Sequence, residues 1–216
     1  MMRFWRHAFA VALLVVAGGT ACSGAAAARP GTTPSPATSQ QAPVPRRANP
    51  ADVAFMSGMI HHHAQAIVMA GWSATHAASP SIRTLSERIT VSQTDEIRMM
   101  QQWLREMGEP APDASPTGQR MVMGGVEHDM LMPGMLTPEQ MTQLDNARGT
   151  AFDRLFLTFM IQHHEGALKM VDDLFGSYGG GADDFIYKIA SDTFADQGSE
   201  IDRMQRMLDA MGAGGR

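Results

Sequence analysis

Two stretches in the first half of this chain repeat their apolar and polar positions at steps of three and four residues. One runs from Asp52 to Met69 and the other from Gln93 to Met107. An α-helix turns about 100° per residue, so such steps keep these positions on one face. A strand would need alternation every two residues, which neither stretch shows. The pattern therefore predicts two long helices, each with one face turned to a core.

Both patterns return in the second half of the chain. The first pattern recurs 101 residues later, from Asp153 to Met170, and reads Asp52-x-x-Phe55-x-x-x-Met59-Ile60-x-His62-His63-x-x-Ala66-x-x-Met69 in its first copy. The second recurs from Gln197 to Met204 and reads Gln93-x-x-Glu96-Ile97-x-x-Met100 in its first copy. Such an internal repeat indicates a duplicated unit. We expect an all-α fold in which two related helical hairpins form an antiparallel four-helix bundle.

Local signals place the ends of these helices. Ser79 and Pro80 suit the N-cap and first position of the second helix, and Gly108 predicts its end. A capping box opens a shorter third helix, at Thr137-Pro138-Glu139-Gln140. The stretch from Met107 to Leu136 then becomes a long, Met-rich crossover between the hairpins.

The N-terminal segment has the features of a bacterial secretory signal. Arg3 and Arg6 precede an apolar run that is too short to span a bilayer, so residues 1–21 are predicted to be a signal peptide. Gly19-Thr20-Ala21-Cys22 resembles a lipobox, with Gly19 where an aliphatic residue is usual, which predicts lipidation of Cys22. The alternative is cleavage at a small-x-small site such as Ala26-Ala27-Ala28, which would release a soluble product.

After the signal, the composition separates a tether from a folded domain. Residues 22–48 are rich in Pro, Ala, Ser, Thr and Gln, which predicts a lipidated Cys followed by a disordered tether. Residues 49–216 are the predicted duplicated helical domain. This organisation places the protein on the outer face of the cell membrane through a lipid anchor, or, in the alternative, as a secreted or periplasmic protein.

Charge and cysteine usage exclude some classes of function. The formal net charge is −5 and the acidic residues are spread along the chain, so no basic face for nucleic acid is expected. Cys22 is the only cysteine, which excludes an intrachain disulfide and a thiolate metal site.

The chain has 19 methionines against 9 Phe, 3 Trp and 2 Tyr, and its buried stripes also contain imidazoles and carboxylates. Buried carboxylates need an ionic partner, a hydrogen bond or a metal, because an isolated buried charge is very costly. The metal-free interpretation is a hydrogen-bonded Asp-His pair surrounded by Met core packing. Imidazole and thioether ligands together favour copper, while carboxylates extend the range to zinc or iron. The candidate metal ligands are Asp52, Met59, His62, His63, Met69, Glu96, Met100, Asp153, Met160, His163, His164, Met170, Glu200 and Met204.

Adjacent histidines on a helix point in different directions. One member of each doublet is therefore expected to face the core, and the other to line its edge or a second site. His61 and His76 are expected at the surface. Four large side chains are expected in the core: Phe55, Trp103, Phe156 and Leu208.

The predicted crossover holds a separate cluster of potential ligands. A flexible loop with several thioethers and one imidazole could capture cuprous ion with little geometric demand. The alternative is a hydrophobic flap packed on the helices. The cluster consists of Met121, Met123, His128, Met130, Met132 and Met135.

With these motifs the chain resembles the domain-of-unknown-function 305 family, whose members carry Met-x-x-His-His-x-x-Ala on a ferritin-like helical bundle. The resemblance extends from about Asn49 to Gly212. It implies a bacterial envelope protein, and the family has been linked to copper binding and copper resistance. The fourteen candidate ligands above match the motif positions of the family. The halves differ at His61 and Ala64, where the second copy has Gln162 and Glu165, so the two halves need not bind alike.

Three functions remain open from the sequence. A copper-binding or copper-buffering lipoprotein needs ligands but no catalytic base, so its partners would be a metal ion and the membrane. A ferritin-like oxidase is the second; the absence of Glu-x-x-His motifs counts against a di-iron centre, but oxidation of cuprous ion stays open. The third is a metal-free envelope domain that binds a protein partner, which the sequence does not identify.

Overall fold

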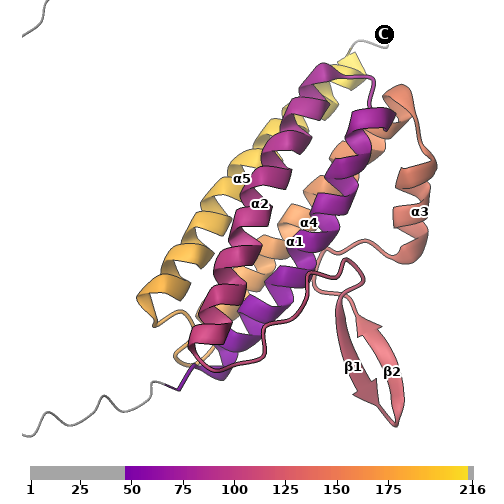
Figure 1. Cartoon of the computed structure of the whole chain (residues 1–216). Coiled ribbons are helices and arrows are strands. Elements are labelled where there is room, and N and C mark those ends of the chain that lie inside the picture. The colour runs from indigo at the N-terminus through magenta and orange to yellow at the C-terminus, as the bar shows by residue number, and fades with distance from the viewer. Residues whose placement is uncertain (1–46, 214–216) are drawn as a thin grey trace, which may run out of the picture. The chain divides into compact units, whose positions relative to one another are not determined.

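The computed structural model describes residues 47–213, and within them it describes residues 121–123, 126–128 and 213 by their backbone alone. The predicted signal peptide, Cys22 and nearly all of the tether lie outside the described residues. The described part is mostly helical, which confirms the all-α prediction (Figure 1). Its helices are α1 (Pro50–His76), α2 (Pro80–Glu106), α3 (Pro138–Asn146), α4 (Gly149–Gly176) and α5 (Asp184–Ala213). None of these helices is long and apolar enough to cross a membrane.

The helix ends follow the local signals in the sequence. Helix α2 begins with Pro80 at its first position and ends just before Gly108, whose φ of 75° suits glycine. The predicted capping box is present at the start of α3, where Thr137 and Gln140 exchange hydrogen bonds. Helix α1 begins at Pro50, and the side chain of Asn49 caps it by accepting from the backbone N–H of Ala51 at 2.8 Å.

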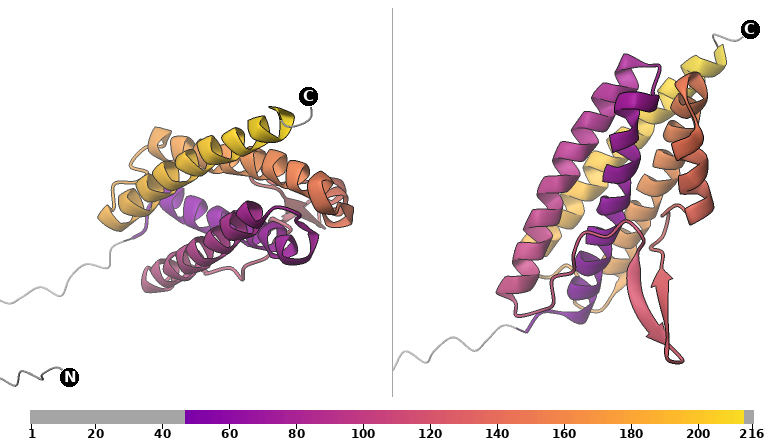
Figure 2. Two further views of the ribbon diagram at one scale, coloured as in Figure 1. Left: turned by 90° about the horizontal axis from the view of Figure 1, so that it is seen from above. Right: turned by 45° about the vertical axis from the view of Figure 1, so that its right-hand side comes forward.

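The four long helices lie side by side as two hairpins (Figures 1 and 2). Helix α1 packs along α2, α4 packs along α5, and the hairpins meet mainly through α1 and α4. The backbones of α2 and α5 approach each other less closely than those of the other neighbouring long helices. Because α1 and α4 are repeat-related, the residues that surround their doublets come together at the middle of the helices.

Two apolar clusters lie on either side of that middle. The first joins Phe55 and Met59, which precede the α1 doublet, to Met170, which follows the α4 doublet. The second joins Met69, which follows the α1 doublet, to Phe156 and Met160, which precede the α4 doublet. Each cluster therefore contains residues of both hairpins, and the repeat-related counterpart of each of these residues lies in the other cluster. Of the large side chains expected in the core, Phe55, Trp103 and Phe156 are buried and Leu208 is partly buried.

Asp52 and Asp153 each form hydrogen bonds with the turn that connects the two helices of the other hairpin. Asp52 Oδ1 accepts a hydrogen bond from the backbone N–H of Gly181, between α4 and α5, at 2.7 Å. Asp153 accepts from the backbone N–H groups of Ala78 and Ser79, between α1 and α2, at 3.1 and 3.0 Å. Both carboxylates thus satisfy backbone donors near the start of a helix, which is a structural role.

The crossover has regular structure where the sequence predicted a flexible loop. It forms an antiparallel hairpin of β1 (Gln119–Met123) and β2 (Val126–Met130). Gly124 and Gly125 connect the strands with φ values of 61° and 83°, which a two-residue turn with positive φ requires. This Gly-Gly pair between two short stretches was the available signal for the hairpin.

After the hairpin, the crossover touches α4 at a contact between two glycines. A Cβ placed on Gly166 of α4 would lie 2.0 Å from the carbonyl oxygen of Pro133 and 2.5 Å from Cα of Gly134. Gly134 itself has a φ of 77°. The backbone of residues 133–134 can approach α4 this closely only because both positions lack a side chain.

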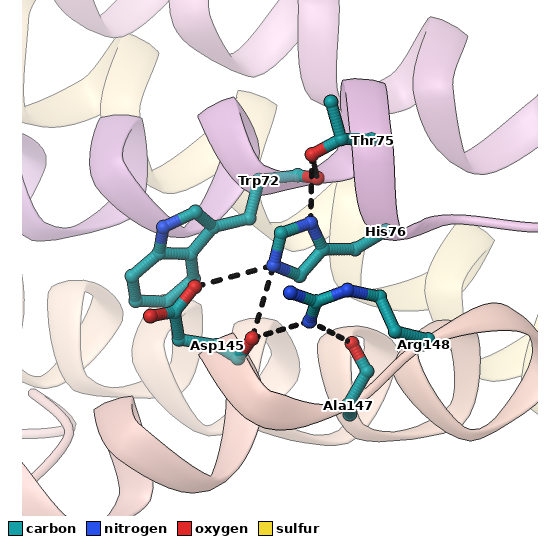
Figure 3. A network of polar contacts seen from close by, with 6 residues as sticks. All are labelled: Trp72, Thr75, His76, Asp145, Ala147 and Arg148. Carbon is teal, nitrogen blue, oxygen red and sulfur yellow. Dashed lines mark hydrogen bonds and ion pairs between the residues drawn. The ribbon is translucent and has the colours of Figure 1, made fainter.

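A polar network around His76 holds the C-terminal end of α1 (Figure 3). His76 Nε2 donates to the backbone oxygen of Asp145 at 3.0 Å, and the hydroxyl of Thr75 lies 2.8 Å from His76 Nδ1. Arg148 donates to the backbone oxygen of Ala147 at 2.7 Å beside it. The network joins α1 to the junction of α3 and α4. The expectation that His76 and His61 lie at the surface is wrong, since their exposed fractions are 9% and 6%.

Replacing Gly166 by Ala should destabilise the protein, because the added methyl group overlaps the backbone of residues 133–134. We expect the free energy of unfolding to fall by about 2 kcal/mol or more, as for other overpacked sites. Gly198→Ala is the matched control: Gly198 is also inside a helix, but its added Cβ would meet nothing within 4 Å. That control should be neutral or stabilising by about 0.5–1 kcal/mol. Equal effects in urea denaturation would contradict the close contact.

Candidate metal centre

The four histidines of the two doublets are all fully buried at the middle of α1 and α4. The rings of His62 and His163 face each other across the contact between these helices, with centroids 3.8 Å apart and planes inclined at 39°. The expectation that one member of each doublet lines an edge is therefore wrong. The turn of about 100° between neighbours sends one ring to the other hairpin and the next to the second helix of its own hairpin.

Each outer histidine contacts a glutamate on the neighbouring helix. His63 Nε2 lies 2.6 Å from Glu96 Oε2 on α2, and His164 Nε2 lies 2.8 Å from Glu200 Oε2 on α5. Burial alone would raise the pKa of Glu96, but the hydrogen bond and charge of His63 outweigh it and the pKa is lowered. Glu96 is therefore a carboxylate that accepts the Nε2–H of His63. The repeat places His164 and Glu200 in the same relation.

His62 makes the third such contact, to the backbone. Its Nε2 lies 3.0 Å from the carbonyl oxygen of Pro133, which can only accept, so this nitrogen carries the proton. The Nδ1 atoms of His62, His63 and His164 are buried and have no hydrogen-bond partner, and neither ring nitrogen of His163 has one. In metal sites, a ligating histidine typically donates its other ring N–H to a carboxylate or a backbone carbonyl. Three of the four rings already have that arrangement.

The two inner histidines are held in their neutral form. Burial, together with the charge of His63, lowers the pKa of His62 to about 3. Burial and the charge of His62 lower the pKa of His163 well below its ordinary value. A neutral imidazole keeps one lone pair, which is the form that binds a metal. The structure therefore presents unprotonated ring nitrogens at the centre of the protein at neutral pH.

The structure brings only part of the predicted ligand set to this centre. The histidines and both glutamates come together there, while the methionines lie in the two flanking clusters, Met59, Met100 and Met170 in one and Met69, Met160 and Met204 in the other. Asp52 and Asp153 each precede their doublet by ten residues, which is about 15 Å along a helix. Within residues 47–213, no group of three or more His, Cys, Asp or Glu side chains is arranged to hold a metal ion.

Nevertheless, the donors present fit a soft cation. Unpartnered neutral imidazole nitrogens and nearby thioethers are ligands that copper prefers. The thioether of Met59 belongs to the turn of α1 that precedes His62 and His63, and it is completely buried.

Two buried glutamines were not among the predicted ligands. Gln93 and Gln197 are 3% and 4% exposed, and neither the oxygen nor the nitrogen of either amide has a partner. They precede Glu96 and Glu200 by three residues, on the same helix faces. The signal in the sequence was their matching place in the repeat, because a glutamine that recurs on a buried face is unusual.

The residues of the crossover cluster have different surroundings. Met135 is buried, and its sulfur accepts the backbone N–H of Met132 at 3.3 Å. Met132 packs against the first apolar cluster, while Met130 is 42% exposed. Met121, Met123 and His128 are described by their backbone alone, and the register pairs Met121 with His128. Met132 and Met135 therefore pack on the protein as expected for a hydrophobic flap.

Acid should destabilise the metal-free protein through His62 and His163. Both pKa values are lowered in the folded state, whereas an unfolded chain titrates near pH 6.5. Below about pH 6.5 the unfolded chain binds protons that the folded chain excludes, so stability is lost as the pH falls toward 3. For His62, whose pKa is about 3, the free energy of unfolding should fall by about 2 kcal/mol between pH 7 and pH 5, and His163 should add to this loss.

Urea denaturation at both pH values measures this loss. The double variant His62→Leu/His163→Leu should show a shallower dependence on pH than the wild-type protein. Met59→Leu/Met160→Leu is the matched control, because it changes two buried side chains without removing a titrating group. An unchanged slope in the histidine variant would show that these rings are not kept neutral by folding.

Comparisons with known proteins agree on one family. The family model described as Domain of unknown function (DUF305) matches residues 52–208. A crystal structure of a DUF305 protein from Streptomyces coelicolor superposes with a TM-score of 0.61 at 27% identity, covering 75% of this chain and 92% of that one. CopM in the Cu(I)-bound form gives a TM-score of 0.57 at 25% identity, covering 74% of this chain and 96% of that one. CopM is also known in Cu(II)-bound and Ag-bound forms.

A shorter similarity reaches a viral protein. Uncharacterized protein L153 of Acanthamoeba polyphaga mimivirus is 38% identical over 55 residues, which are 26% of this chain. The match spans only 36% of the viral protein.

Proposed function

The chain belongs to the DUF305 family, and we propose that it is an extracytoplasmic protein that binds and buffers copper at its buried histidines. The observation that carries the proposal is the set of unpartnered ring nitrogens at the centre, where three of four imidazoles already donate their other N–H to an oxygen. Copper here is the cargo. Its binding would need ligands and no catalytic base.

The chemistry of the surroundings favours cuprous ion. Completely buried thioethers flank the imidazoles on both sides, and soft ligands in apolar surroundings suit the monovalent state. The fourteen residues of the repeat have different roles in this proposal: the histidines and methionines are the ligands, and Glu96 and Glu200 orient two of the histidines. Asp52 and Asp153 would act on the site through the hairpin packing that they stabilise. Other transition metals would compete through the carboxylates.

We also propose the β1–β2 hairpin as a secondary site for cuprous ion. Met121 pairs with His128 in the ladder, and Met123 and Met130 each lie two residues away along their own strands. Positions two apart in a strand share a side of the ladder, so the register assigns these four positions to one side. The hairpin projects from the helices (Figures 1 and 2), which leaves this site within reach of solvent.

The proposed location rests on the N-terminal sequence. The signal peptide, the lipidated Cys22 and the tether would hold a ferritin-like bundle, built from two repeated hairpins and a Met-rich crossover, at the outer face of the cell membrane. The CopM structures in copper-bound and silver-bound forms support the choice of metal for this family.

Removing the central imidazoles should abolish tight copper binding. The quadruple variant His62→Ala/His63→Ala/His163→Ala/His164→Ala should lose at least one tight equivalent in competitive titrations with cuprous and cupric ions, using protein without a His tag. The control His61→Ala/His76→Ala removes two histidines outside the centre and should keep that equivalent. A weaker equivalent that survives the quadruple variant would belong to the hairpin.

A milder variant tests the role of the glutamates in the same titration. Glu96→Gln/Glu200→Gln keeps all four imidazoles but weakens the hydrogen bonds that orient two of them, so affinity should fall by about 10–100-fold. Glu87→Gln/Glu165→Gln removes two exposed glutamates as the matched control. Oxygen uptake with cuprous ion would favour the oxidase instead, and a folded protein that binds no copper would favour the interaction domain.

A further inference from the structure

The facing sides of α2 and α5 form a polar band, which we call the α2–α5 seam and define by Gln93, Glu96, Asp192, Asp196, Gln197 and Glu200. These two helices lie farther apart than the other neighbouring long helices. The inner end of the seam is the pair of glutamates that contact His63 and His164. A polar band thus extends from the surface to the buried imidazoles on this side of the protein.

Carboxylates continue the seam outward from Glu200 along α5. Asp192, Asp196 and Glu200 follow one another at four-residue steps, which keeps them on one face of α5. Burial, followed by the charge of Glu96 on α2, raises the pKa of Asp196, and Asp192 and Glu200 add to the effect. The α5 stripe therefore faces Glu96. Lys188 pairs with Asp192, and Arg88 acts on Asp196 from α2, so the negative charge is only partly compensated.

The inner part of the seam holds polar groups with no partner. Both amides, of Gln93 and Gln197, are at least nine-tenths buried and make no hydrogen bond. Thr193, one turn before Gln197, is 1% exposed, and its hydroxyl is also without a partner. An unsatisfied buried polar group destabilises the folded state. Water or a cation that reached these groups would supply the missing partners.

The opposite side of the imidazoles is closed by the crossover. Pro133 covers His62 through the hydrogen bond at 3.0 Å. Gln65 of α1 accepts from the backbone N–H of Leu136 at 2.6 Å and donates to its oxygen at 3.0 Å. The contact between Gly134 and Gly166 brings the same segment onto α4. A cation that approached from this side would have to displace a hydrogen-bonded segment of backbone.

We propose that the α2–α5 seam is the path by which a hydrated transition-metal cation moves between solvent and the buried imidazoles. The carboxylates attract the cation, and the amide oxygens of Gln93 and Gln197 replace part of its lost hydration. The unpartnered ring nitrogens then receive it. This inference rests on the proposed copper binding and adds the route, which assigns a function to two residues outside the proposed ligand set.

Binding kinetics of cupric ion test the route. Association can be followed by stopped-flow quenching of tryptophan fluorescence, and dissociation by transfer to excess chelator. Gln93→Leu/Gln197→Leu should slow both rates by about tenfold and leave the dissociation constant unchanged, because the amides stabilise the passage rather than the bound state. The metal-free variant should also be more stable than the wild-type protein, since two unsatisfied amides are removed.

A charge variant tests the outer part of the seam independently. It also tests the route if the glutamine variant does not fold. Asp192→Asn/Asp196→Asn should slow association at least about threefold at low ionic strength, with the difference vanishing at high salt. Asp172→Asn/Asp173→Asn removes the same charge from exposed positions of α4 and should keep the wild-type rate.

The results of these experiments test the route and the proposed copper binding separately. Copper binding with wild-type rates in both seam variants overturns the route and leaves the proposed function intact. Weaker affinity without slower rates in the glutamine variant also overturns it, because the amides would then be ligands. A wild-type protein that binds no copper overturns both.

Discussion

The structure depends on keeping two buried imidazoles, those of His62 and His163, without charge. Their ring centroids lie 3.8 Å apart between two apolar clusters, where a proton on either ring would be both desolvated and close to other histidines. The fold gives the Nε2–H of His62 an oxygen acceptor and leaves its Nδ1 without a partner. A neutral ring nitrogen without a partner keeps a lone pair that a metal ion can use, which is the physical basis of the proposed copper site.

Duplication makes the two halves similar, and the crossover makes them unequal. Each hairpin supplies a histidine doublet, a glutamate that contacts the outer ring, and an aspartate that caps the other hairpin. The chain has only one crossover, and its Pro133 carbonyl holds His62 while its repeat-related counterpart His163 has no partner. The two inner histidines therefore differ because the single crossover packs on one side of the α1–α4 contact. The sequence differences at His61 and Ala64 add to this inequality.

Several features of the centre oppose stability. The buried amides of the α2–α5 seam and the unpartnered ring nitrogens would be replaced by apolar side chains in a core selected for packing alone. They are concentrated around one layer of the protein, while the apolar clusters on both sides are filled by large Met, Phe, Ile and Leu side chains. This division assigns the stabilising apolar contacts to the two clusters and leaves the unpartnered polar groups in the central layer, where the proposed copper site lies.

The sequence by itself determined the helices and the residue types of the site. The three- and four-residue steps, the proline starts and the capping box at Thr137 are local signals, so they predicted α1, α2 and α3 before any packing was known. The 101-residue repeat predicted two equivalent doublets on helices of one bundle. These features depend on neighbours within a turn or two of helix, or on the identity of two halves, and both can be read along the chain.

Only the tertiary structure decided which groups come together. Both members of each doublet are buried because α2 and α5 cover the side that an isolated helix pair would leave open. Asp52 and Asp153 cap backbone groups of the other hairpin, more than 70 residues away in sequence, and spacing within one helix cannot show such a partner. The acceptor for His62 is likewise a backbone carbonyl, which any residue could provide. Contacts of this kind depend on the relative positions of distant segments, and these are fixed only when the whole core packs.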